Sequence, residues 1–163
     1  LQEDGSAPVV LLSAGVGITP MQSMLEHLLG ADAGNAGPIG KDGNGSAAVA
    51  APRRTIHFLH AARHGGVHAF KTRLAELAAQ HSQLRSMVYY ESPRAEDLPG
   101  RDFAASGRID LATLDPVWLP ADAQYYLCGP VGFLQVQKAA LLARGVPAQA
   151  IFLEVFGTGG FAQ

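Results

Sequence analysis

Cysteine is nearly missing from this chain, which contains only Cys128. A single thiol excludes an internal disulfide and is typical of the reducing cytoplasm, where we expect this protein to reside. Charge of one sign is lacking as well, because 12 lysines and arginines stand against 14 aspartates and glutamates, for a net charge of −2. Without a basic excess, neither nucleic acid nor an anionic membrane surface is expected as a partner.

Long apolar runs are also absent. No stretch of the sequence approaches the roughly 20 apolar residues that a membrane-spanning helix needs. What the chain does have is a hydrophobic fraction of 48% in 163 residues, which is enough to bury one core without disulfides. The first residue is Leu1 rather than methionine. We therefore expect residues 1–163 to form a single domain, monomeric as a module and excised from a longer chain.

The most informative stretch is residues 8–30, which predicts a buried strand, a glycine turn and an amphipathic helix. The run VVLL at residues 9–12 is what a parallel strand covered on both faces requires. Three residues mark the start of the helix: Thr19 as its N-cap, Pro20 as its first residue and Gln22 as the partner in a capping box. Gly30 is predicted to end it.

The turn before this helix, SAGVGI at residues 13–18, contains two glycines that let the backbone come close to a bulky ligand. A helix N-terminus offers N–H groups and the positive end of a dipole, so a phosphate is the natural guest. The turn is therefore predicted to bind a nucleotide. It is not the usual dinucleotide fingerprint, because Pro20 stands where the third glycine belongs. A tight connection that needs glycine for packing alone stays open as the alternative.

Strands and helices alternate along the rest of the chain. Further strands are predicted at residues 55–60, 87–91, 124–128 and 151–156, and further helices at 70–80, at 109–114 beginning with Asp110, and from Pro130 to about Arg144. A glycine- and alanine-rich stretch at residues 31–52 is interpreted as a flexible insertion. This alternation predicts a three-layer, doubly wound α/β domain with a parallel sheet of five, or at most six, strands.

Histidines recur at positions 60, 64 and 68, a spacing that would make a metal-binding face on a helix. Gly65 and Gly66 interrupt any such helix, so we predict no metal site and interpret the three as loop histidines. Arg63, at the end of the second strand, could face a phosphate of a bound coenzyme or be a solvated arginine. No aspartate or glutamate follows this strand to bind a pair of ribose hydroxyls.

Ligands bind doubly wound domains in a crevice at the carboxyl ends of the strands. Four stretches of this sequence fall at such ends: residues 15–20, 60–64, 128–133 and 154–156. Because the carboxyl ends of parallel strands meet at one edge of the sheet, these stretches are predicted to converge there.

Four motifs together resemble the NAD-binding domain of flavohaemoglobins, the bacterial nitric oxide dioxygenases of the ferredoxin-reductase superfamily. The motifs are SAGVGITPM (13–21), HAARHGGVHAF (60–70), YYLCGPVGF (125–133) and EVFG (154–157). The resemblance covers nearly the whole chain except residues 31–52. It implies a ferredoxin-reductase-like module that binds NAD(P)H directly, preferring NADH. It also implies an FAD-binding barrel domain and a haem-containing globin domain in the same parent chain.

The resemblance also assigns site residues. Residues 15–20 would hold the pyrophosphate and ribose with Thr19 near the nicotinamide, while Gly129 and Pro130 would form the opposite wall. Cys128 would lie beside the nicotinamide, Phe156 would cover the flavin and Glu154 would tune its electrostatics, which makes these three the predicted catalytic set. The other predicted cofactor-binding residues are Gly15, Val16, Gly17, Ile18, Pro20, His60, Arg63, Val131, Gly132, Phe133, Val155, Gly157 and Thr158, where Thr158 replaces the family's proline.

The function implied is hydride transfer from NADH to FAD, followed by electron transfer to haem for nitric oxide dioxygenation. The nearest alternative is a reductase that delivers electrons to an iron–sulfur protein or an oxygenase. A hydrolase with Ser13 as nucleophile would need glycine at position 11, where Leu11 stands. A non-catalytic nucleotide-binding module would lack the flavin-docking surface that the C-terminal EVF predicts.

Overall fold

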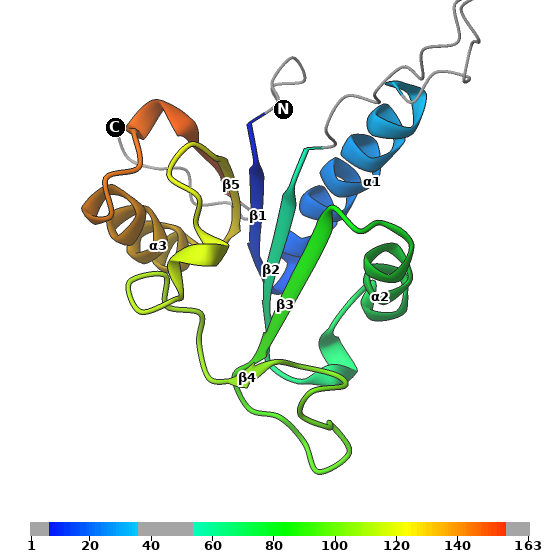
Figure 1. Cartoon of the computed structure of the whole chain (residues 1–163). Coiled ribbons are helices and arrows are strands. Elements are labelled where there is room, and N and C mark those ends of the chain that lie inside the picture. Colours follow the sequence, from blue (N-terminus) through cyan, green and yellow to red (C-terminus); the bar gives the residue numbers. More distant parts are fainter. Residues whose placement is uncertain (1–6, 36–53, 156–163) are drawn as a thin grey trace, which may run out of the picture.

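A sheet of six parallel strands lies between two layers of helices in the computed structural model, which describes residues 7–35 and 54–155 (Figure 1). The strands lie in the order β4-β3-β2-β1-β5-β6, so the chain crosses from one half of the sheet to the other at the central strand β1. This confirms the predicted doubly wound parallel fold. The strands are β1 (Val9–Ala14), β2 (Ile56–Ala62), β3 (Leu84–Tyr90), β4 (Ala105–Ser106), β5 (Gln124–Gly129) and β6 (Ile151–Val155).

Each face of the sheet buries its own core. Helices α1 (Ile18–Asn35) and α2 (Lys71–Gln80) cover one face, and α3 (Val131–Ala143) covers the other (Figure 1). Along β1, Val9 and Leu11 pack in the first core whereas Val10 and Leu12 pack in the second, as the alternation of side chains along a strand dictates. The continuous apolar run at the start of β1 follows from this burial on both sides.

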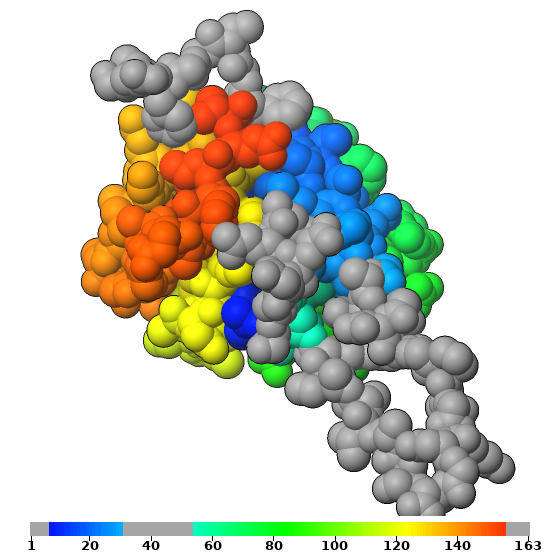
Figure 2. Space-filling model, turned by 90° about the horizontal axis from the view of Figure 1, so that it is seen from above, coloured from blue at the N-terminus to red at the C-terminus, as the bar shows by residue number. Residues whose placement is uncertain are grey.

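β6 forms one edge of the sheet and pairs with β5. Seen from the edge at which the strands begin, the red segment of β6 reaches the surface between the orange of α3 and the blue of α1 (Figure 2). The edge strand β6 therefore carries side chains that a ligand or a neighbouring domain can reach.

The start of α1 differs from the predicted capping box. A 3-10 turn, Gly15–Gly17, runs directly into the helix, and the Ile18 N–H donates to carbonyls of that turn. Thr19 and Pro20 are consequently the second and third helical residues rather than the cap and the first residue. The Gln22 side chain donates within the helix, one turn further on, and does not reach back. The prediction was wrong because the 3-10 turn already supplies acceptors at the helix start.

α1 also ends later than predicted, because it continues past Gly30 to Asn35. Gly30 is exposed, and a Cβ added there would meet no atom within 4 Å. An exposed glycine is tolerated inside a helix at a cost of about 1 kcal/mol, so it need not end one. The predicted insertion at residues 31–52 therefore begins as helix, and its remainder from residue 36 lies outside the described residues.

Replacement of Gly30 by alanine is expected to raise the free energy of unfolding by about 0.5–1 kcal/mol, since alanine loses less backbone entropy in a helix. Urea unfolding followed by circular dichroism measures the change. Gly145→Ala is the matched control, because Gly145 follows α3 with a φ of 85°, where alanine costs about 1–2 kcal/mol. Two substitutions with the same sign would contradict this account of the glycines.

Other boundaries were misplaced for local reasons. Residues 109–114 form a turn rather than a helix, because the Asp110 carboxylate accepts from a backbone N–H two residues on and Gln137 of α3 hydrogen-bonds the segment's backbone at two places. Phe70 precedes α2 with a left-handed φ of 57° instead of lying within it. β3 begins at Leu84, earlier than the predicted residue 87.

Candidate functional site

The carboxyl ends of β1, β2, β5 and β6 are neighbours in the sheet, which brings the four predicted stretches to one edge. Ser13 of β1 is the register partner of both His60 in β2 and Cys128 in β5, and Cys128 is the partner of Glu154 in β6. The predicted convergence is therefore confirmed as far as Val155. Three of the predicted residues, Phe156, Gly157 and Thr158, lie outside the described residues.

The two glycines of the turn do different work. Gly15 is exposed with a φ of 55°, and a Cβ added there would meet no atom within 4 Å, so it serves the backbone conformation. Gly17 is buried, and its Cβ would overlap the Cys128 carbonyl oxygen and lie 2.6 Å from the carbonyl carbon. Gly17 thus lets the turn rest directly on the end of β5. Gly17 is therefore a glycine for reasons of packing, as the alternative interpretation of the turn expects. Gly15 and the surface beside it remain accessible to a ligand.

The predicted binding residues differ in how far solvent reaches them. Val16 is 64% exposed, and with Thr19 and Pro130 it borders the start of α1, where helix N–H groups can meet a phosphate. The exposed members are Gly15, Val16, Thr19, Arg63, Pro130, Gly132 and Glu154, the half-buried ones are Pro20, Val131, Phe133 and Val155, and the buried ones are Gly17, Ile18, His60, Cys128 and Gly129.

Cys128 offers this edge an uncharged thiol. The side chain is fully buried, and burial raises its pKa to about 11, with the nearby Glu154 carboxylate acting in the same direction. A thiol with so high a pKa stays protonated at neutral pH and is a poor nucleophile. The buried thiol therefore packs in the core beneath this edge, and the geometry does not suit it to a covalent step.

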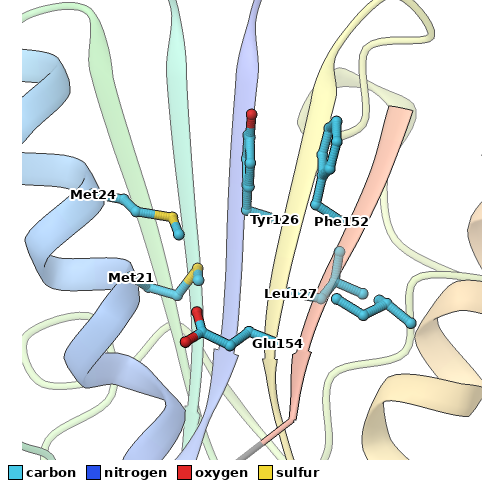
Figure 3. A pocket seen from close by; sticks show the side chains of 7 residues that line it. Met21, Met24, Tyr126, Leu127, Phe152 and Glu154 are labelled. Atoms are coloured by element: carbon cyan, nitrogen blue, oxygen red, sulfur yellow. The ribbon is translucent and has the colours of Figure 1, made fainter. Parts of the chain in front are cut away.

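An open groove of about 260 Å³ runs along the α1 side of β5 and β6. Met21 and Met24 of α1 point across it toward Tyr126, and Glu154 lies nearer the carboxyl ends of the strands (Figure 3). Tyr126 and Phe152 stack at 4.7 Å between ring centroids, which gives the groove an aromatic floor. Sequence reasoning missed this feature, because the stacking depends on the pairing of Tyr126 in β5 with Phe152 in β6.

The end of β2 is polar and held in place by Asp97. This carboxylate accepts from the backbone N–H groups of Gly65 at 3.1 Å and Arg94 at 2.8 Å, and a Cβ on Gly65 would overlap it. The Arg94 guanidinium lies 3.0 Å from the His64 ring, and Arg63 is exposed nearby in sequence. The edge beyond β2 thus carries cationic donors, and the carboxylate beside them, Asp97, comes from a distant part of the sequence rather than from the segment that follows β2.

The interpretation of all three histidines as loop residues was wrong for His60, which lies in β2 and is 1% exposed, and His68 is buried at 8%. Ser13 Oγ lies 2.8 Å from His60 Nδ1, and the Tyr90 hydroxyl lies 2.9 Å from His68 Nδ1. Burial lowers the pKa of His60 to about 3 and that of His68 to about 4, so both rings are neutral at neutral pH. Within the described ranges, no three histidine, cysteine or acidic side chains gather to hold a metal ion.

Fold and site together define a class of protein: a doubly wound parallel α/β domain with a glycine turn and a helix N-terminus at the switch point, the place where such domains bind ligands. Residues 11–139 match the profile of the family described as "Oxidoreductase NAD-binding domain". The chain belongs to this family. Among the residues that the structure describes, no helix has the length and apolar character to cross a membrane.

Flavohemoproteins are the relatives that resemble the chain in sequence. This chain is 46% identical to the flavohemoprotein of Chromobacterium violaceum over 97% of the chain's own length. It is 48% identical to the flavohemoprotein of Bordetella pertussis over 98% of the chain's own length. It spans 34% and 35% of those two proteins, about a third of their length. This confirms the resemblance drawn from the four motifs.

Solved structures give the same result. The flavohem-like FAD/NAD binding domain of nitric oxide dioxygenase from Vibrio cholerae matches with a TM-score of 0.70 and 34% identity, over 96% of this chain and 53% of that one. A flavohemoglobin from Malassezia yamatoensis with bound FAD and heme matches with a TM-score of 0.70 and 27% identity, over 96% of this chain and 33% of that one.

Proposed function

We propose that this chain is the reductase domain of a flavohaemoglobin, one compact domain within a longer protein. It would bind NADH for reduction of an FAD, from which electrons reach a globin haem for nitric oxide dioxygenation. An FAD-binding barrel and a globin domain in the same parent chain would fill the two thirds of the relatives' length that this chain does not span. The proposal includes a cytoplasmic location, which the single cysteine favours, and a monomeric module.

One observation carries the proposal: Gly17 rests on the backbone of Cys128, which joins the exposed glycine turn to the end of β5. The backbone at Gly15 and Val16 is exposed, and the N–H groups of this 3-10 turn fit a diphosphate, because the Ile18 N–H is already paired within the turn and Pro20 has none. The groove beside β6 fits a flat ring system, and the buried Cys128 thiol adds no charge to this edge. The residues present thus suit a dinucleotide that lies along the carboxyl edge.

When bound, the dinucleotide supplies a hydride and the flavin accepts it. The part of this chain is to hold the reacting groups at contact distance and keep water out, because direct hydride transfer needs alignment more than acid–base groups. The 3-10 turn before α1 would bind the diphosphate, and Gly129 and Pro130 would limit the nicotinamide on one side. Cys128 would lie beneath the nicotinamide as a buried, uncharged neighbour. Phe156 and Glu154 stay the predicted residues on the flavin side.

Nitric oxide consumption by the full-length protein tests the proposed acceptor. We expect NADH-dependent loss of nitric oxide in air, measured with an electrode. Oxidation of NADH that reduces an added iron–sulfur protein but consumes no nitric oxide would favour the alternative reductase. That alternative has support from fold alone, since a cytochrome P450 reductase and a ferredoxin reductase match this structure at only 19% and 14% identity.

Arg63→Glu tests the choice of coenzyme. NADH should be the preferred donor, with NADPH accepted because the exposed Arg63 at the end of β2 can meet the additional phosphate. The substitution is expected to lower kcat/KM for NADPH about tenfold and to leave that for NADH within about twofold. Arg85→Glu is the control, because this exposed arginine lies near the opposite end of β3. Equal losses with both coenzymes would contradict the role of Arg63.

A further inference from the structure

We propose that His60 is a positioning residue for the dinucleotide, which holds the end of β1, and hence the glycine turn, through its hydrogen bond to Ser13. The inference rests on the proposed function and assigns a role that His60 can fill from the interior. A side chain 1% exposed offers a ligand almost no surface, so His60 acts through its neighbour and not by contact.

A polar row crosses the sheet beneath the start of α1. Glu154, Cys128, Ser13 and His60 are successive register partners on β6, β5, β1 and β2. Cys128 packs in the core under α1, and side chains at paired positions share one face of the sheet. Within this row, near the end of β1, Ser13 and His60 form a hydrogen bond: Ser13 Oγ lies 2.8 Å from His60 Nδ1.

Beside His60, on the α2 side of the sheet, His68 and Tyr90 form a second hydrogen-bonded pair. His68 Nδ1 lies 2.9 Å from the Tyr90 hydroxyl, and the His60 and His68 rings are 5.0 Å apart between centroids. The Nε2 atoms of both rings are buried with no partner among the described residues. Whichever nitrogen carries the proton, each ring keeps one polar atom unsatisfied, at a cost of about 1–3 kcal/mol. Apolar side chains in these places would avoid that cost, so the Nδ1 bonds must serve something other than stability.

Ser13 is where the bond acts on the site. Only Ala14 separates it from the 3-10 turn Gly15–Gly17, and Gly17 in turn touches Cys128. Loss of either partner breaks the side-chain bond that ties the end of β1 to β2 and leaves the other polar group buried and unsatisfied, a cost that a shift of β1 relieves. A shift of this strand end moves the N–H groups of the turn away from the diphosphate, which weakens binding of the dinucleotide without moving the reacting rings.

The experiment is anaerobic stopped-flow reduction of the flavin in the full-length protein by NADH. For His60→Leu we expect the half-saturating NADH concentration to rise about tenfold, which corresponds to about 1.4 kcal/mol, with the limiting rate within about twofold. His60→Asn places a polar atom near the position of Nδ1 and should restore most of the affinity. Ser13→Ala removes the other partner with little change of volume and should reproduce the loss even if His60→Leu folds poorly.

His57→Leu is the matched control. His57 lies in the same strand, is 3% exposed and also has a single Nδ1 contact, 2.9 Å from the Trp118 carbonyl oxygen, but away from the turn. It should lower stability without raising the half-saturating concentration. An equal rise for His57→Leu and His60→Leu, or no rise for both His60→Leu and Ser13→Ala in folded protein, would overturn the inference. A wild-type flavin that NADH does not reduce would instead overturn the proposed function and, with it, the inference.

Discussion

Gly17→Ala is expected to lower the free energy of unfolding by about 3 kcal/mol or more and to slow flavin reduction by NADH at least about tenfold. The added methyl would overlap the Cys128 carbonyl, which belongs to the backbone of a central region of the sheet and cannot rotate away. Relief requires the turn to lift off β5, and this separates the two walls of the site. Urea unfolding and stopped-flow reduction measure the two effects.

Two neighbouring glycines serve as controls for Gly17→Ala. Gly15→Ala meets open space and should cost only the strain of a positive φ, about 1–2 kcal/mol. Gly129→Ala would place its Cβ 2.9 Å from the Phe133 ring, a side chain that can turn aside, so its effect should be intermediate. A Gly17→Ala protein as stable and as active as Gly15→Ala would show that the turn does not rest on β5.

Acidification from pH 7.5 to 5 is expected to lower the free energy of unfolding by about 4 kcal/mol through His60 and His68 together. Burial holds their folded pKa values at about 3 and 4, whereas the unfolded chain has values near 6.5. Below pH 6.5 the unfolded chain therefore binds protons that the folded protein does not, and stability falls as the pH falls toward 4. Above about pH 7.5 these two histidines contribute almost no slope.

The charges around this pair do not change the direction of the effect. The Lys71 ammonium lowers the pKa of His68 further, and the Asp102 carboxylate raises it. Hydrogen bonds from Arg101, the Leu98 N–H and Lys71 hold the pKa of Asp102 below its usual value, so its own contribution is lost only at more acidic pH. The double variant with asparagine at positions 60 and 68 should lose most of the slope between pH 6.5 and 5. His57→Asn should lose a smaller part, because burial lowers the pKa of His57 as well. An unchanged slope in the double variant would contradict the assignment.

The main elements could be predicted because each has a local cause. The apolar run of β1 and the glycine at the end of α3 depend on neighbours in sequence alone. β4 could not be found in this way, because Ala105–Ser106 is a strand only through its pairing with Tyr89 and Tyr90. The end of α1 was misjudged because an exposed glycine weakens a helix without stopping it.

The candidate site likewise has parts that the sequence predicts and parts that depend on the three-dimensional structure. The motifs identified the glycine turn and the end of β5, but the contact between Gly17 and Cys128 depends on strand order, which brings β1 beside β5. The bond between Ser13 and His60 likewise depends on register, so a histidine at the end of a strand could not be told from a loop histidine. The groove beside β6 exists only once α1 lies over the sheet edge.

Hydride transfer is the central claim, and anaerobic reduction of the flavin by NADH deuterated at C4, compared with unlabelled NADH, tests it most directly. In the full-length protein we predict saturable reduction whose limiting rate falls several-fold with the transferred deuterium. Flavin that dithionite reduces but saturating NADH does not would contradict the account.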